Sequence, residues 1–148
     1  MVRVINPVKK YGPVLRGDKP WEGLFVEVGT VLYDEEDRLY KMWYYAQETF
    51  KVARMRGRVC KGEGYVCYAT SKDGKRWEKP SLGFFKYDGS KENNICGSWG
   101  TEVIKDYSEP DPAKRYKKMS FYKQPNWNDV ISVHHGYWVA YSKDGLYW

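Results

Sequence analysis

The chain has 148 residues, a formal net charge of +6 and a negative mean hydropathy. This length favours a single domain that can bury a real core. No apolar run approaches the roughly 18–20 residues that a membrane-spanning helix needs, so we predict no membrane partner. Three cysteines without C-x-x-C spacing argue against a disulfide framework and a zinc site, so we predict no metal and no cofactor.

The basic charge is not accompanied by a nucleic-acid-binding motif. We interpret the densest basic stretch, residues 51–61, as a solvated loop and predict no nucleic-acid partner. Residues 1–7 hold too few apolar residues for a signal peptide, which predicts a cytoplasmic protein. Aromatic residues make up 18% of the chain, and this content favours β-strands, on whose half-buried surfaces aromatic rings pack well.

The first part of the chain is predicted to be an arm followed by three strand segments. Residues 1–29 form the arm, because Asn6-Pro7, Gly12-Pro13 and Lys19–Gly23 are typical of extended, turn-rich structure. The segments that follow are rich in β-branched and aromatic residues and are bounded by turn residues, as strands are. They are Thr30–Asp34, Tyr40–Tyr45 and Tyr65–Trp77.

The second part of the chain repeats these three segments in the same order. They are Glu102–Asp106, Tyr116–Tyr122 and Tyr137–Trp148. Ser71 and Ser142 lie 71 residues apart, whereas Met42 and Met119 lie 77 apart. A longer turn at residues 107–114 of the second copy accounts for the drift, because loops absorb insertions and strands do not.

Each third segment ends in the same Ser-Lys-Asp-Gly-x-x-Trp turn, at Ser71–Trp77 and at Ser142–Trp148. The Asp can bond its own following backbone, and the Gly supplies a positive φ. We expect the Trp to fold back and anchor the turn. We predict little helix, because no stretch shows sustained apolar periodicity of 3.6 residues. Leu82–Asp88 is predicted to be an outer strand of the first unit or a bridge to the second.

The repeat predicts an all-β fold of two antiparallel β-propeller-like blades with an extended N-terminal arm. A β-sandwich, which also uses many short strands, is the alternative. The expected organisation is a single β domain over residues 1–148. Its arm covers residues 1–29, its first blade residues 30–88 and its second blade residues 89–148.

Several motifs resemble those of bacterial glycoside-hydrolase-like five-bladed β-propeller proteins, relatives of glycoside hydrolase families 32 and 43. They are Asp18–Gly23, Tyr40–Tyr44, Tyr68–Pro80, Asp88–Ile95 and Asp111–Lys117. The resemblance covers roughly residues 5–148 but only about two blades. The sequence is then expected to be either a piece of a longer propeller or a homo-oligomer that completes a ring: two units per chain and three chains would give six blades, within the range of about four to eight that propellers have.

The resemblance also implies a carbohydrate partner and a pair of catalytic carboxylates around an oxocarbenium-like transition state. The candidates are Glu22, which lies beside Trp21, and Asp106. Asp106 is placed like the Asp of the Arg-Asp-Pro motif of family 32, with Lys105 instead of Arg and Tyr107 instead of Pro. A structural role is the alternative for each: a carboxylate near a packed Trp, and a turn residue that recurs in both units.

Three tryptophans outside the predicted strands are candidates for stacking on sugar rings, with packing as the alternative: Trp21, Trp99 and Trp127. His134-His135 has no partner at metal-ligand spacing, so we predict no metal there. The predicted function is a glycoside-hydrolase-like propeller module that binds or hydrolyses carbohydrate and completes its ring by self-association. The alternative is a non-catalytic carbohydrate- or protein-binding oligomeric module.

Overall fold

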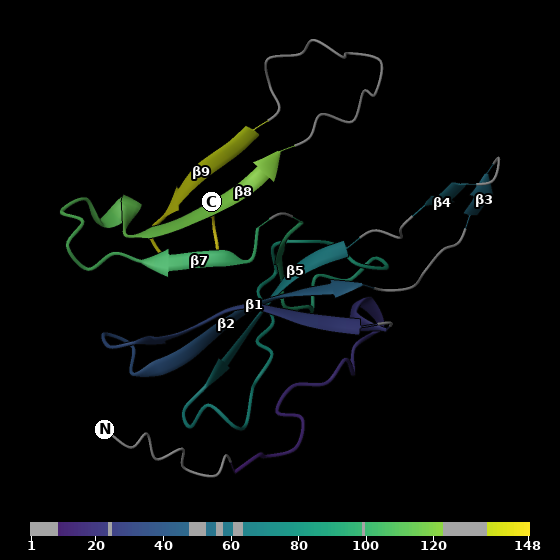
Figure 1. Cartoon of the computed structure of the whole chain (residues 1–148), viewed down its shortest axis with the longest axis horizontal. Helices are drawn as coiled ribbons and strands as arrows, with labels where there is room; N and C mark the ends of the chain where they lie inside the picture. Colours follow the sequence, from purple (N-terminus) through teal and green to yellow (C-terminus); the bar gives the residue numbers. More distant parts are fainter. Residues whose placement is uncertain are drawn as a thin grey trace, which may run out of the picture.

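The computed structural model describes residues 9–23, 25–47, 53–55, 58–60, 64–98, 100–122 and 136–148. Within these ranges the protein is all-β, with an antiparallel sheet of four strands and another of three (Figure 1). The described ranges contain no α-helix, only the short 3₁₀-helices η1 (Pro20–Glu22) and η2 (Pro112–Lys114). The predicted fold class of two antiparallel sheets and an arm is confirmed, and the two sheets do not close a ring.

The four-stranded sheet has the order β1-β2-β5-β6. Its strands are β1 (Phe25–Asp34), β2 (Leu39–Gln47), β5 (Gly64–Ser71) and β6 (Ile95–Gly97). The first three contain the predicted strands, although β1 begins inside the segment predicted as arm. A separate hairpin of β3 (Ala53–Met55) and β4 (Arg58–Cys60) lies between β2 and β5 in the sequence.

The fourth strand of this sheet is β6, and Leu82–Asp88, predicted to be an outer strand or a bridge to the second unit, is not a strand. That segment contains only an isolated bridge between Tyr87 and Ser90. β6 instead pairs with β5, as Cys67 opposes Ile95. The first sheet therefore extends to Gly97, whereas the sequence placed the border between the units at residue 88.

The three-stranded sheet has the order β7-β8-β9 and confirms the predicted second set of strands. They are β7 (Glu102–Lys105), β8 (Tyr116–Tyr122) and β9 (Gly136–Ser142). The register defines the repeat more sharply than the sequence did. Tyr40 pairs with Ser71 as Tyr116 pairs with Ser142, so Met42 is equivalent to Lys118 rather than to Met119.

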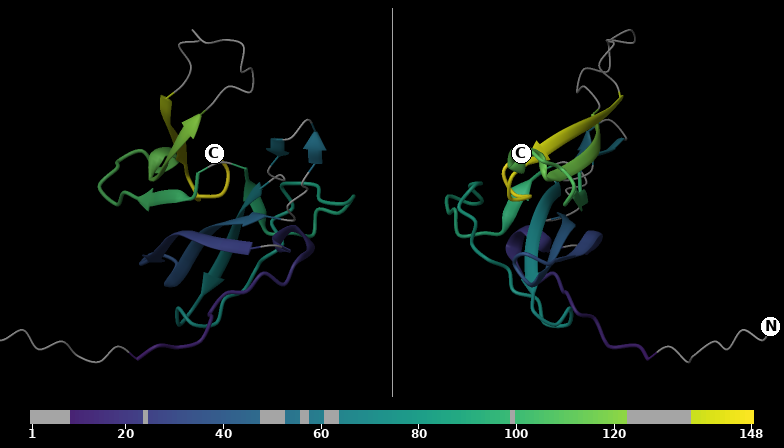
Figure 2. Two further views of the ribbon diagram at one scale, coloured as in Figure 1. Left: turned by 45° about the vertical axis from the view of Figure 1, so that its right-hand side comes forward. Right: turned by 90° about the vertical axis from the view of Figure 1, so that its left-hand side faces the viewer.

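Two apolar clusters cover the two faces of the first sheet. The first cluster, on the side of the N-terminal arm, joins Trp21 of η1 to Met42 and Tyr44 of β2. The second cluster lies between the two sheets and joins Trp43 of β2 to Val103 and Tyr116 of the second sheet. The two sheets are thus packed one against the other, as Figure 2 shows from two sides. The first sheet lies between the arm and the second sheet.

Local chemistry fixes both repeated turns as predicted. Gly74 and Gly145 have φ values of +69° and +77°, which a residue with a Cβ rarely adopts. Asp73 Oδ1 accepts a hydrogen bond from the backbone N–H of Lys75 at 2.9 Å, and Asp144 Oδ1 accepts from that of Leu146 at 2.8 Å. None of the helices in the described ranges is long and apolar enough to cross a membrane.

Candidate functional site

Glu22, the first candidate carboxylate, is buried at the end of η1. Its Oε2 accepts hydrogen bonds from the backbone N–H of Asp18 at 3.0 Å and from Lys79 Nζ at 2.6 Å. Its Oε1 accepts from the Tyr44 hydroxyl at 2.5 Å. Lys79 also contacts the Asp18 carboxylate at 2.7 Å, so one lysine joins two carboxylates. Both oxygens of Glu22 are engaged inside the protein.

The contacts of Glu22 continue to Trp21, the candidate sugar platform. The Tyr44 hydroxyl accepts from Asn94 Nδ2 at 2.6 Å, and Asn94 Oδ1 accepts from Trp21 Nε1 at 2.9 Å. The Trp21 ring is buried and lies edge-on to Tyr87 with the ring centroids 5.4 Å apart. In this structure Trp21 packs in the first cluster, and its ring faces are not open to a sugar.

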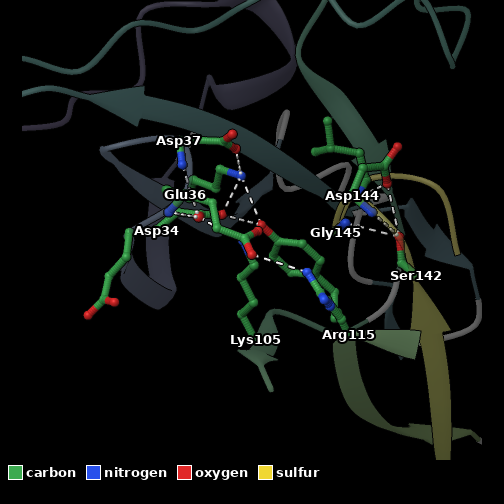
Figure 3. Close-up of polar contacts among 12 residues, drawn as sticks. Asp34, Glu36, Asp37, Lys105, Arg115, Ser142, Asp144 and Gly145 are labelled. Carbon is green, nitrogen blue, oxygen red and sulfur yellow. Dashed lines mark hydrogen bonds and ion pairs between the residues drawn. The ribbon is translucent and has the colours of Figure 1, made fainter. Parts of the chain in front are cut away.

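A second polar cluster lies where the two sheets meet, around Asp34 at the end of β1 (Figure 3). Asp34 Oδ2 accepts from Lys41 Nζ at 2.7 Å and from the Tyr116 hydroxyl, and Oδ1 accepts from Lys105 Nζ at 2.7 Å. Burial alone would raise the pKa of Asp34. The hydrogen bonds from Lys105, Lys41 and Tyr116 outweigh this and hold the pKa well below its usual value.

The hairpin that follows Asp34 makes further contacts to the second sheet. Glu36 accepts from Lys105 Nζ at 2.7 Å and from Arg115 Nη1 at 3.1 Å, as the labelled side chains in Figure 3 show. On the next strand of the first sheet, Trp43 donates its Nε1–H to the Gly145 carbonyl at 2.8 Å. Charge pairing and a buried hydrogen bond therefore add to the apolar contact between the sheets.

Asp106, the second candidate carboxylate, follows β7 in the second sheet. Its Oδ2 accepts from Lys117 Nζ at 2.7 Å, and its Oδ1 accepts from the Ser108 hydroxyl at 2.6 Å. Hydrogen bonds from Lys117 and Ser108 lower the pKa of Asp106 to about 2. Lys117 also contacts the Glu109 carboxylate at 2.9 Å.

The structure does not bring the two candidate carboxylates together. Glu22 belongs to the arm side of the first sheet, and Asp106 belongs to the sheet that packs on the opposite side. Trp99 and Trp127, the other two candidate platforms, lie outside the described residues. Of the three predicted sugar platforms, the described part of the chain contains only Trp21, which is buried.

The described residues show little chemistry suited to acid catalysis or metal binding. A general acid of a glycosidase needs a raised pKa, whereas lysine hydrogen bonds lower the pKa values of Asp18 and Glu109. Within the described ranges no group of three or more His, Cys, Asp or Glu residues is arranged to hold a metal ion. Cys67 and Cys96 are buried free thiols, and burial raises the pKa of Cys96 to about 12, which leaves it inert as a nucleophile.

No protein-family model, curated protein or solved structure matches this chain. The internal repeat supplies a template instead. The Asp106–Lys117 pair is equivalent to the Asp34–Lys41 pair, and both have the same 2.7 Å separation. The side chains of Lys41 and Asp34 are 8% and 0% exposed, whereas those of Lys117 and Asp106 are 23% and 31% exposed. The Asp106 cluster is thus an open copy of a cluster that the second sheet covers.

The outer face of the second sheet, which points away from the first sheet, is also more exposed than the equivalent face of the first sheet. Ile104, Met119 and Val139 lie on this face and are 60%, 52% and 54% exposed. Met119 pairs with Val139, and Ile104 pairs with Lys117, so the register places these side chains on one face. Their equivalents in the first sheet lie in or against the second cluster: Trp43 and Tyr68 are buried, and Leu32 is partly buried.

Sequence reasoning identified Asp106 but missed its lysine partner and the apolar face beside it. A signal was present, because Tyr40-Lys41 and Tyr116-Lys117 lie in the first three residues of the equivalent strands of the two units. Each lysine then donates to the Asp at the end of β1 or just after β7. The repeat of an Asp and a Tyr-Lys pair across a hairpin could have predicted both clusters.

Proposed function

We propose that this protein is a non-catalytic binding module that stacks on another β-sheet unit through the outer face of β7-β8-β9. One observation carries this proposal. Ile104, Met119 and Val139 are more than half exposed, while the equivalent side chains of the first sheet are covered by a neighbouring sheet. A contiguous exposed apolar face of this kind is typical of an interaction site.

The acidic cluster beside this face supports binding rather than hydrolysis. A glycosidase needs two carboxylates around one site, with one of them able to donate a proton. Here Lys117 bridges Asp106 and Glu109, and Lys79 bridges Asp18 and Glu22. Hydrogen bonds from these lysines lower the pKa values of Asp18, Asp106 and Glu109, which opposes a role of these three carboxylates as a general acid. Binding or hydrolysis of a carbohydrate stays a prediction from the sequence.

The proposal is tested by measuring molar mass in solution over a range of protein concentrations. Light scattering on a size-exclusion column is expected to show a mass that rises with concentration. Met119→Lys places a charge in the middle of the outer face and should hold the mass at that of one chain. Val14→Lys, at an exposed apolar position of the arm, is the matched control and should behave as the unchanged protein does.

A mass of one chain at every concentration would contradict the proposal, as would association that Met119→Lys leaves intact. A glycoside panel measured on the same samples distinguishes the enzyme hypothesis. Release of sugar that Glu22→Gln or Asp106→Asn abolishes would replace the binding proposal by the catalytic one.

A further inference from the structure

The second sheet docks on the first through three side chains of its covered face: Val103, Lys105 and Tyr116. Val103 and Tyr116 are buried in the second cluster. The backbone N–H of Val103 donates to Thr30 Oγ1 at 3.1 Å, and Lys105 and Tyr116 bind Asp34. This set of an aliphatic, a cationic and a phenolic side chain is what the first sheet recognises.

The register identifies the equivalent set on the first sheet as Val31, Tyr33 and Tyr40, which we call the tyrosine patch. Tyr33 pairs with Tyr40 as Lys105 pairs with Tyr116, and Val31 lies two residues before Tyr33 as Val103 lies two before Lys105. The rings of Tyr33 and Tyr40 lie 4.9 Å apart.

The tyrosine patch is open to solvent. Val31 and Tyr33 are 46% and 47% exposed and Tyr40 is partly exposed, although the patch lies on the sheet face that carries the arm. The arm packs its Trp21 against Tyr44 and against Met42, the cross-strand partner of Val31, while Val31 and Tyr33 stay exposed at this end. The chain therefore exposes two surfaces that are equivalent to the two surfaces that meet where its own second sheet packs on its first sheet. One half is the tyrosine patch, and the other is the outer face of the second sheet together with the Asp106–Lys117 pair.

Resting on the proposed function, we infer that the partner of the outer face is a second copy of this chain, docked head to tail through its tyrosine patch. The two copies would repeat the packing of the second sheet on the first. The Tyr40 hydroxyl of the incoming copy would then stand where Tyr116 stands and would donate to Asp106. The Tyr33 hydroxyl would stand where the Lys105 ammonium stands, as a second donor.

The hydrogen-bonding groups of the two surfaces are complementary. Asp34 Oδ2 accepts from both Lys41 and Tyr116, whereas in the described part of the chain the equivalent Asp106 Oδ2 accepts only from Lys117 and keeps room for a further donor. The tyrosine patch supplies two phenolic donors and an aliphatic side chain to an apolar face. In the described part of the chain the Tyr40 hydroxyl has no hydrogen-bond partner, so the donor is free for a second copy.

The contact between copies must be weaker than the contact within the chain. Met119 stands where Trp43 stands and cannot donate a hydrogen bond, and the Gly74 carbonyl already accepts from Trp77 Nε1 at 3.2 Å. Tyr33 is neutral where Lys105 is charged. We therefore expect association that depends on concentration. Because a head-to-tail contact uses two different surfaces, repeated docking gives a ring or an open chain of copies.

The test uses two variants of the full chain, each with one damaged surface. Val31→Lys damages the tyrosine patch and Val139→Lys damages the outer face, and each alone is expected to have the mass of one chain. An equimolar mixture should form a complex of two chains and no larger species, because each variant keeps the surface that the other lacks. Far-UV circular dichroism and thermal unfolding verify that both variants fold, and Val14→Lys again serves as the control.

Other outcomes overturn the inference in distinguishable ways. If Val31→Lys still associates while Val139→Lys does not, the outer faces meet each other. The proposed function then stands and the head-to-tail arrangement is wrong. If the mixture stays at the mass of one chain although the unchanged protein associates, the inference is also wrong. If the unchanged protein never associates, both proposals fail.

Discussion

The chain contains one aspartate–lysine hairpin twice, and the two copies differ in what lies against them. Both copies hold the ion pair at 2.7 Å and place the Asp at the start of a hairpin, so local sequence fixes this geometry. Asp34 is buried because Tyr116 and Lys105 of the next sheet cover it. Asp106 has no such cover among the described residues. The difference shows that burial is set by the neighbouring sheet and not by the hairpin itself.

The two Trp-anchored turns show the same division between local and tertiary structure. In the first turn Trp77 donates to the Gly74 carbonyl, as a local anchor would. In the second turn the Gly145 carbonyl accepts from Trp43 of the first sheet instead. Trp148 packs in the second cluster, with Lys118 Nζ 4.7 Å from its ring centroid. In the second turn, Trp43 of the first sheet therefore supplies the hydrogen bond that the Trp of the turn supplies in the first turn.

The largest expected effect comes from removing the buried aspartate. Asp34→Ala leaves Lys41 and Lys105 without their shared carboxylate, and breaking a buried ion pair in this way costs about 3–5 kcal/mol. Asp106→Ala removes the exposed copy and should cost only a small fraction of this. Urea unfolding of the two variants measures the difference. Equal losses would show that the second hairpin is buried in solution too.

The elements of the fold were predictable because they depend on local sequence. Ser71 and Gly74 mark the end of a strand in any context, and alternating β-branched and aromatic residues mark the strands themselves. β6 was missed because three residues carry too little pattern. The repeat offset was misjudged because Met42 and Met119 match by chance, whereas strand register is a tertiary property.

The candidate site was less predictable, since its contacts join distant parts of the chain. Glu22 and Lys79 are 57 residues apart, and Asp34 and Lys105 are 71 apart. Sequence reasoning could select Glu22 and Asp106 as carboxylates of interest. It could not show that each has a lysine partner, or that Trp21 is enclosed by the first sheet.

An intermediate effect is expected from the paired tyrosines. Tyr116→Phe leaves Asp34 and Lys41 short of a hydrogen bond at a buried position, which costs about 1–3 kcal/mol of unfolding free energy. Tyr40→Phe removes the equivalent hydroxyl, which belongs to the tyrosine patch of the first sheet, and should change stability by less than about 0.5 kcal/mol. Tyr40→Phe should nevertheless weaken association between copies. Tyr116→Phe should lower the stability of the chain instead. Denaturant unfolding and light scattering of both variants separate the two roles, and a stability loss in Tyr40→Phe as large as in Tyr116→Phe would contradict this view.

The smallest expected effect is the contribution of Asp106 to stability in acid. Its pKa is lowered from 3.8 to about 2, so the folded chain binds this proton less readily than the unfolded chain does. The contribution is therefore complete above about pH 4 and disappears as the pH falls through about 2. Asp106→Asn should match the unchanged protein at pH 2 and be slightly less stable at pH 6. High salt should shrink the difference, because an exposed pair is screened. If docking of a second copy buries Asp106, the stability difference between the unchanged protein and Asp106→Asn at pH 6 should grow with protein concentration. Such growth would show that the ionised Asp106 carboxylate contributes to the head-to-tail contact.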